Sequence, residues 1–285
     1  MEPEEPETPA PQDGCEAMSP ADRAALARAV TLLERTSLAA TIAHALGKPA
    51  ARLGALAPAS ARLLIERAAT LALERAAKAA ARSLPPSPGP ARARLHAALS
   101  AACGAAGGAL GLTPAGLGAL AVELPVSTLV ILRAIADVAR AEGEDPQAEA
   151  TAMACLEVFA LGGRSETDNE MDSAYFALRG LLAKAMRDSA RHLAAHGLAR
   201  EGAPALLRLA GLIAPRFGAH VARKVAAQSL PLIGALGGAA INYAFARHFE
   251  DLARGHFTVR RLERAYGAQP VAQAYARLAA AARAR

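Results

Sequence analysis

Histidine and carboxylate side chains recur at helical spacing towards the C-terminal end of this 285-residue chain. His248 and Asp251 stand three positions apart, so one face of a helix would carry both and the carboxylate could orient the imidazole. His256 adds a second imidazole just after Gly255, where we expect a helix to end. These three side chains would suit a hydrolase-like site, but no Gly-x-Ser-x-Gly nucleophile elbow accompanies them. The alternative is that His256 is a buried histidine whose ring is bonded to the backbone.

Two further histidines, His192 and His196, lie one helical turn apart in the stretch HLAAH. Zinc-binding helices use that spacing, but the stretch lacks the glutamate of H-E-x-x-H and no third ligand is evident. Both precede Gly197, and the negative end of a helix favours a histidine in the last turn. We therefore expect no metal here. The glycine-rich stretches GALGLT and GALGG neither follow a strand nor end in Gly-Lys-Ser/Thr, so we expect no cofactor.

Glu157 is a carboxylate within the apolar stretch CLEVF. A charged group on an apolar helix needs a partner, and Arg133 on the preceding helix is the candidate. We interpret this pair as a structural ion pair rather than as a catalytic acid and its activator. No residue is assigned a catalytic role.

The elements that would position these side chains are helices. Ser19, Pro20 and Asp22 match the cap, first helical position and capping-box acid of a helix that runs to about residue 46. Proline and glycine then divide the rest of the chain into further helices. We expect one helix at about 60–82, one on each side of Thr113-Pro114, and one that ends at residue 196. The others are expected at 125–142, 146–161, 203–214, 216–229, 241–254, 258–266 and 270–284. Residues 1–18 are expected to be a disordered acidic tail, 19–285 one helical domain, and the proline-rich stretch near 83–91 a loop.

Composition supports an all-α fold. The chain is 53% hydrophobic but only 4% aromatic, and it contains no tryptophan. Alanine and leucine are good helix formers, and period-2 alternation is hard to find. With so few rings, close packing requires helices whose backbones approach closely, which alanine and glycine permit. We expect a multi-helix globular bundle with glycine-rich apolar helices at its centre.

Charge is distributed unevenly along the chain. The first 16 residues hold six acidic and no basic residues, which leaves 32 basic against 20 acidic residues, a net charge of +12, for the remainder. Such a body favours anionic partners, such as lipid headgroups, an acidic protein surface or nucleic acid. The alternative is a coding bias towards arginine. Three cysteines without CxxC spacing, and no secretory signal, indicate a reducing cytoplasm.

Two long runs lack any charged residue: 97–122, and the 22 residues between Lys224 and Arg247. The second is long enough to span a bilayer, yet its glycine, alanine and polar content makes insertion marginal. Both runs have glycines four positions apart, which permits close helix packing in lipid or in a protein core. Bilayer insertion and burial in the fold both stay open. We expect the Gly234–Gly238 helix to pack against the Gly104–Gly111 segment.

Two stretches resemble the EcsC protein family: PLIGALGGAAINYAFARHFEDLARGHFTVRRLERAYG (231–267) and ELPVSTLVILRAIADVARAEGEDPQAEATAMACLEVFALGG (123–163). The resemblance extends over roughly residues 25–267. It implies a helical fold and a membrane-proximal accessory role, because the family's namesake is encoded beside an ABC transporter. It brings no established chemistry. The candidate functional residues that match its motifs are Arg133, Glu157, Pro231, Gly234, Gly238, Asn242, His256, Arg261 and Glu263.

These observations favour a non-enzymatic, membrane-associated helical accessory protein, and the family resemblance implies an ABC transporter as its partner. The expected partner is an anionic membrane surface or a membrane protein, and the expected location is the cytoplasm, at or partly within its membrane. A hydrolase-like enzyme using His248, Asp251 or His256, with an unknown small-molecule substrate, is the alternative. Nucleic acid is not an expected partner, because aromatic platforms are scarce and no recognised binding motif occurs.

Overall fold

The computed structural model describes residues 18–35, 67–76, 98–99, 101–102, 105, 114–145, 148–161, 174–196, 204–228 and 234–284. Every regular element in these ranges is a helix, which confirms the all-α prediction. The acidic residues 1–17, the proline-rich loop near 83–91, Gly104, Gly111 and Pro231 lie outside the described residues. Predictions that fall on those segments therefore stay predictions.

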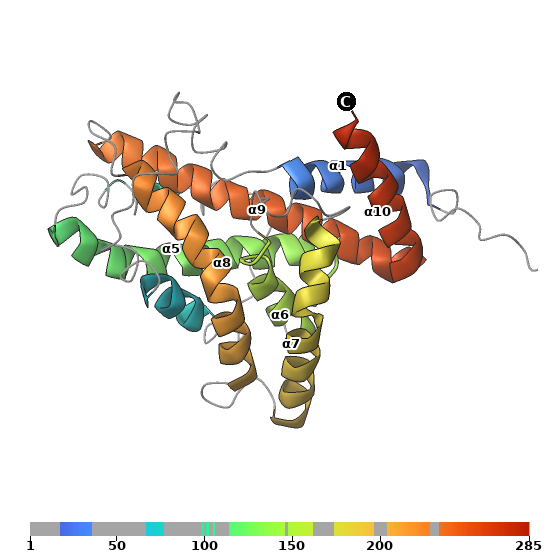
Figure 1. The fold of residues 1–285 in the computed structure, drawn as a ribbon, viewed down its shortest axis with the longest axis horizontal. Helices are drawn as coiled ribbons and strands as arrows, with labels where there is room; N and C mark the ends of the chain where they lie inside the picture. The colour runs from blue at the N-terminus through green and yellow to red at the C-terminus, as the bar shows by residue number, and fades with distance from the viewer. Residues whose placement is uncertain are drawn as a thin grey trace, which may run out of the picture.

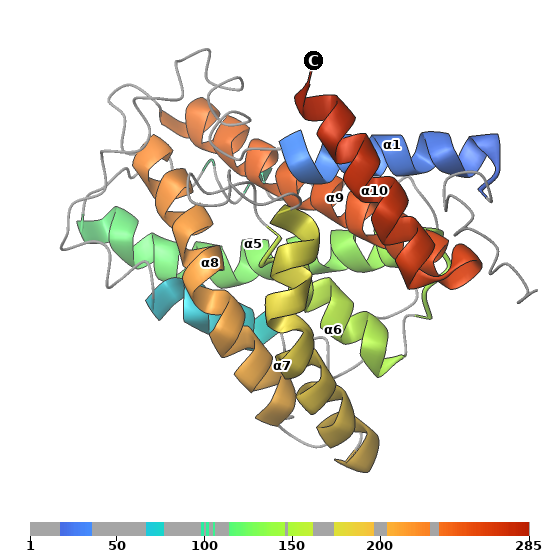
Figure 2. The same cartoon turned by 45° about the vertical axis from the view of Figure 1, so that its right-hand side comes forward.

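The longest helix organises the molecule. The helices are α1 (Pro20–Arg35), α5 (Pro114–Ala141), α6 (Glu149–Glu157), α7 (Ala174–His196), α8 (Pro204–Gln228), α9 (Gly234–Tyr266) and α10 (Ala268–Arg283), with a further helical segment at 67–76. Helix α9 runs the length of the molecule, with α1 and α10 packed on its C-terminal half and α5 alongside it (Figure 1). Helices α7 and α8 form a neighbouring pair that lies in front of α5 in both views (Figures 1 and 2).

Local sequence signals set several helix ends as predicted. The Ser19 hydroxyl accepts a hydrogen bond from the backbone N–H of Asp22 at 3.1 Å and donates one to the Asp22 carboxylate at 2.9 Å, so the predicted cap is present. Gly143 and Gly267 have φ angles of 80° and 89°, a left-handed conformation that glycine adopts without steric cost. They follow α5 and α9 respectively, as predicted.

Two prolines do not end helices, contrary to prediction. Pro125 lies inside α5 rather than at a helix start, and Pro215 lies inside α8, which is one helix instead of two. A proline within a helix costs about 3 kcal/mol through the lost hydrogen bond and a steric clash. Burial offsets this cost, because Leu124 beside Pro125 and Ile213 near Pro215 are both fully buried.

Gly255 also lies inside a helix, so the predicted end of a helix at this position is wrong. Helix α9 continues through it to Tyr266. A Cβ atom at this position would lie 2.7 Å from Cγ of Leu33 and 3.2 Å from the carbonyl oxygen of Ala29. Glycine is therefore required because α1 crosses α9 too closely for any side chain.

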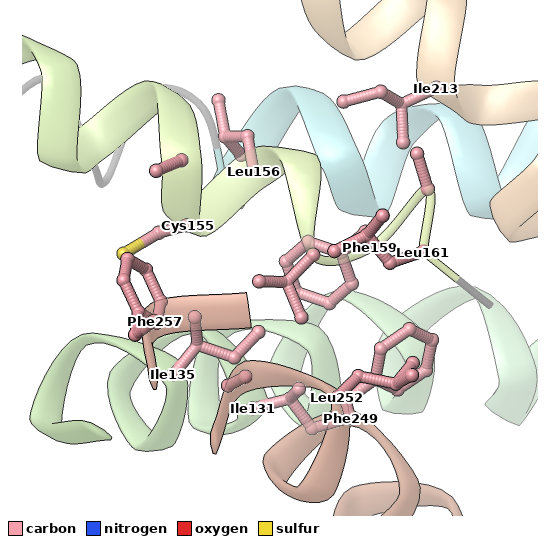
Figure 3. Close-up of a cluster of buried hydrophobic side chains, with 14 of the residues drawn as sticks. Ile131, Ile135, Cys155, Leu156, Phe159, Leu161, Ile213, Phe249, Leu252 and Phe257 are labelled. Atoms are coloured by element: carbon pink, nitrogen blue, oxygen red, sulfur yellow. The ribbon is translucent and has the colours of Figure 1, made fainter. Parts of the chain in front are cut away.

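The described core is built around aromatic rings despite their scarcity. Phe159 contacts Phe217 and Phe249 with ring centroids 5.2 and 5.3 Å apart. Figure 3 shows Phe159 and Phe249 among leucine and isoleucine side chains from α5, α6, α8 and α9. The buried thiol of Cys155 belongs to the same core, and burial raises its pKa to about 12, so it acts as a small hydrophobic group.

The glycine-rich stretch at the start of α9 is only partly described. Gly238 is buried, whereas the side chain of Leu236 is 89% exposed. Its expected partner, the Gly104–Gly111 segment, lies outside the described residues. None of the helices in the described ranges is long and apolar enough to cross a membrane.

Candidate functional site

Residues that carry the family resemblance meet in a buried polar cluster between α6, α7 and α9. Glu157 is the last residue of α6, Tyr175 the second of α7, and His256 lies in the second half of α9. All three are at least 96% buried. We call these three residues the Glu157 cluster. The sequence motifs include Glu157 and His256 but not Tyr175, because nothing in the sequence indicates which aromatic residue faces them.

The cluster is arranged in a row. The Tyr175 hydroxyl and His256 Nδ1 are 3.0 Å apart and share a hydrogen bond, whose direction follows the tautomer of the imidazole. On the other side of the ring, His256 Nε2 lies 3.8 Å from Oε2 of Glu157, which is too long for a hydrogen bond. Among the residues that the structure describes, Nε2 has no hydrogen-bond partner. The imidazole therefore has one satisfied nitrogen and one that faces a carboxyl group across a short gap.

Burial decides the protonation of this cluster. Loss of solvent raises the pKa of Glu157 from 4.5 to about 7, although the nearby Arg179 and Arg260 act in the opposite direction. The same loss of solvent, together with these two arginines, holds the pKa of His256 well below its ordinary value of 6.5. Around neutral pH the cluster is therefore a neutral imidazole beside a carboxyl group that is close to half protonated.

A salt bridge closes the cluster on the side of α7. Arg179 donates two hydrogen bonds to Glu263, at 2.8 and 3.1 Å, in the fork geometry that suits a carboxylate. Its guanidinium also lies 5.4 Å from the ring centroid of Tyr175. Glu263, a third residue singled out from the sequence, thus joins the surroundings of the Glu157 cluster.

The predicted pairing of Arg133 with Glu157 is wrong. Arg133 is exposed on α5, whereas Glu157 is buried, and no salt bridge between these two described residues occurs. The arginines that influence Glu157 are Arg179 of α7 and Arg260 of α9. The place of Arg133 in the chain puts it on the helix before Glu157, but it lies on the exposed side of α5.

The hydrolase-like constellation does not assemble. Asp251 forms ion pairs with Arg247 and Arg254 on its own helix, at 3.5 and 2.6 Å. His248 is buried and lies against the ring of His220, with centroids 5.8 Å apart. Eight residues separate His248 from His256, which corresponds to about 12 Å along a helix. His192 and His196 lie in the last turn of α7 as predicted, and no group of three metal-binding side chains occurs in the described ranges.

A second buried network links α5, α8 and α9. It contains Asn242, a candidate residue of the sequence motif, and two residues that were not predicted, Glu123 and Lys224. Lys224 donates a hydrogen bond to Glu123 at 2.7 Å, and the amide of Asn242 donates another to the same carboxylate oxygen at 2.8 Å. The ammonium of Lys224 is also 5.3 Å from the ring centroid of Phe245. Glu123 follows the first uncharged run and Lys224 precedes the second, a complementary pair of charges that could have signalled their contact.

A third network fastens the C-terminal end of α9 to α1 and to the loop after α5. Arg261 pairs with Asp22 at 2.9 Å and with Glu142 at 2.8 Å. Hydrogen bonds from Tyr266, Arg261 and Ser19 lower the pKa of Asp22 to about 2. These partly exposed ion pairs give Arg261, another residue of the family motif, a structural role.

The chain is thus an all-helical protein with buried polar networks in its interior. Residues of the two long sequence motifs, 123–163 and 231–267, contribute to these networks. A model of the EcsC protein family matches residues 33–262, and the chain belongs to that family. No curated protein and no solved structure matches the chain significantly.

Proposed function

We propose that this chain is a non-enzymatic accessory protein that works at a membrane, bound to an anionic bilayer surface or to a membrane protein. The membrane-protein partner suggested by the family resemblance is an ABC transporter. The observation that carries the proposal is the charge of the chain, which is +12 outside the first 16 residues. A charge of this size and sign attracts anionic lipid surfaces.

The arrangement of the reactive side chains supports a non-enzymatic role. The Glu157 cluster joins a histidine to a carboxyl group, but His256 is 0% exposed and Glu157 4% exposed. A substrate would have to open the packing of α6, α7 and α9 to reach them. The other two candidates for hydrolase chemistry, His248 and Asp251, lie elsewhere on α9 and have other neighbours. The enzymatic alternative therefore gains no support from the geometry.

Cell fractionation tests the proposal. The tagged full-length chain, expressed in a bacterium, should sediment with membranes at low salt. Because the attraction is electrostatic in part, a wash with about 1 M salt should release a substantial share of it. A cytosolic enzyme expressed in the same cells serves as the marker for incomplete lysis. Recovery of the whole protein in the soluble fraction at low salt would refute the proposal.

A further inference from the structure

Helices α7 and α8 present one outward face. They contact each other, and each contacts α6, while α8 also contacts α9. In both views of the fold they lie in front of α5 (Figures 1 and 2). The sides of α7 and α8 that point away from these helices therefore form a common surface. We define the α7–α8 face as the exposed residues between 180 and 188 of α7 and between 211 and 219 of α8.

Large apolar side chains stand exposed on both helices of this face. Leu181 of α7 is 73% exposed and Leu212 of α8 is 58% exposed. One exposed leucine is ordinary on a protein surface, but on α8 Leu212 is accompanied by exposed Gly211, Pro215 and Ala219. These positions follow helical periodicity, so the outward side of α8 is an apolar strip in this region.

The glycines beside the two leucines are not required by close packing within the described fold. Gly180 and Gly211 are exposed, and a Cβ atom added at either would meet nothing within 4 Å. A glycine inside a helix is less favourable than alanine by up to about 1 kcal/mol. At Gly255 the crossing of α1 explains that cost, whereas at Gly180 and Gly211 no contact with the described residues explains it.

The segment that carries this face is strongly basic. Between residues 180 and 223 the sequence contains seven basic and two acidic residues, and α8 has no acidic residue at all. Lys184 and Arg187 are exposed on α7, next to one exposed acid, Asp188. The outward side of α9 differs, because its Arg247 and Arg254 are neutralised by neighbouring acids.

We propose that the α7–α8 face is the surface by which this protein docks on an anionic lipid bilayer. The inference rests on the membrane role proposed above and specifies its contact surface. Leu181 and Leu212 would enter the boundary between headgroups and acyl chains, while the basic residues around them neutralise lipid phosphates. A second copy of the chain fits this face less well, because two surfaces of the same charge repel each other.

Leu236 offers a matched control on another side of the molecule. Its side chain is 89% exposed, and it lies nine residues before Phe245 on α9. Nine residues correspond to two and a half helical turns, so the two side chains point in opposite directions. Phe245 faces Lys224 of α8, and Leu236 therefore faces away from α8.

Vesicle co-sedimentation of the full-length chain tests the inference. The probes are vesicles of phosphatidylcholine alone, and of phosphatidylcholine and phosphatidylglycerol in roughly a 2:1 ratio. We expect the protein to bind the anionic vesicles, and Leu181→Glu and Leu212→Glu each to weaken binding by about tenfold or more. Leu236→Glu adds the same charge and should change binding by less than about twofold. Circular dichroism and thermal unfolding show whether each variant is folded.

A second pair of variants leaves the apolar side chains intact. Lys184→Gln and Arg187→Gln should each weaken binding by about fivefold at low salt, and by less at about 0.5 M salt. If the wild-type protein binds neither kind of vesicle, the inference fails, and fractionation decides whether a protein partner sustains the proposed function. If the wild-type protein binds anionic vesicles, and the Leu181 and Leu212 variants bind them as well as Leu236→Glu does, the α7–α8 face is not the docking surface. The proposed role at a membrane would then stand. If the wild-type protein is a dimer, and Leu212→Glu abolishes the dimer but leaves vesicle binding unchanged, the α7–α8 face binds a second copy of the chain and the inference is overturned.

Discussion

Replacing Glu157 by glutamine should make the protein more stable at alkaline pH, and the size of the effect follows from the pKa of the buried carboxyl group. That pKa is about 7 in the folded protein against 4.5 for an ordinary glutamate. Because the folded value is raised, the contribution of this group to stability is fully present below pH 4.5 and is lost as the pH rises through 7. A difference of about 2.5 pKa units corresponds to about 3 kcal/mol.

Glutamine keeps the shape of the side chain but cannot ionise. The free energy of unfolding of Glu157→Gln, relative to wild type, should therefore increase by about 3 kcal/mol between pH 4.5 and pH 8. Urea unfolding followed by circular dichroism, at a series of pH values within this window, measures the difference. If the stability curves of the two proteins run parallel from pH 4.5 to pH 8, the assignment of a protonated, buried Glu157 is refuted.

His256→Gln is the complementary variant. The folded pKa of His256 lies well below 6.5, so its stabilising effect is complete above pH 6.5 and is lost as the pH falls below that value. The stability of His256→Gln relative to wild type should therefore increase towards acid pH, opposite to the trend for Glu157→Gln. Two variants of one cluster with opposite pH trends would be difficult to explain by a general loss of packing.

Two substitutions test the packing and the charge networks. Gly255→Ala should lower the free energy of unfolding by about 1–3 kcal/mol, because the new Cβ meets α1. Gly180→Ala, at an open helical position, should raise it by about 0.5–1 kcal/mol. Urea midpoints that shift in the same direction for both variants would contradict the close crossing of α1 and α9. Lys224→Met should cost about 3–5 kcal/mol by leaving the Glu123 carboxylate buried without its cation, and adding Glu123→Gln should recover part of that loss. A double variant no more stable than Lys224→Met would show that the pair is not coupled.

Helix ends were predictable where the deciding chemistry is local. The cap at Ser19 and the stops at Gly143 and Gly267 depend on side chains and φ angles within a few residues. Pro125 and Gly255 were misjudged because their roles depend on distant segments. At Pro125 burial outweighs the lost hydrogen bond, and at Gly255 the crossing of α1 decides the residue type.

Two of the three residues of the Glu157 cluster were predictable from the sequence, but their contact with each other was not. Glu157 and His256 were identified through the sequence motifs, and they meet in the structure. Their neighbour Tyr175 and the nearby Arg179 were missed, because partners across a bundle depend on how each helix is rotated about its axis. Sequence periodicity gives the buried side of one helix, not the residue that it faces on the next.

The contacts of α1 have a consequence for biosynthesis. Asp22 bonds to Arg261, 239 positions further along the chain, and Glu34 accepts a hydrogen bond from Tyr275 across 241 positions. At about 5–20 residues per second, the ribosome needs roughly 10–50 s to make the partners of α1 after α1 itself. During that time Leu26 and Val30, which are buried in the finished fold, have no α9 or α10 to cover them. Helix α1 is thus made well before the helices that cover it, and the nascent chain should need a chaperone to shield it until α9 and α10 have been synthesised.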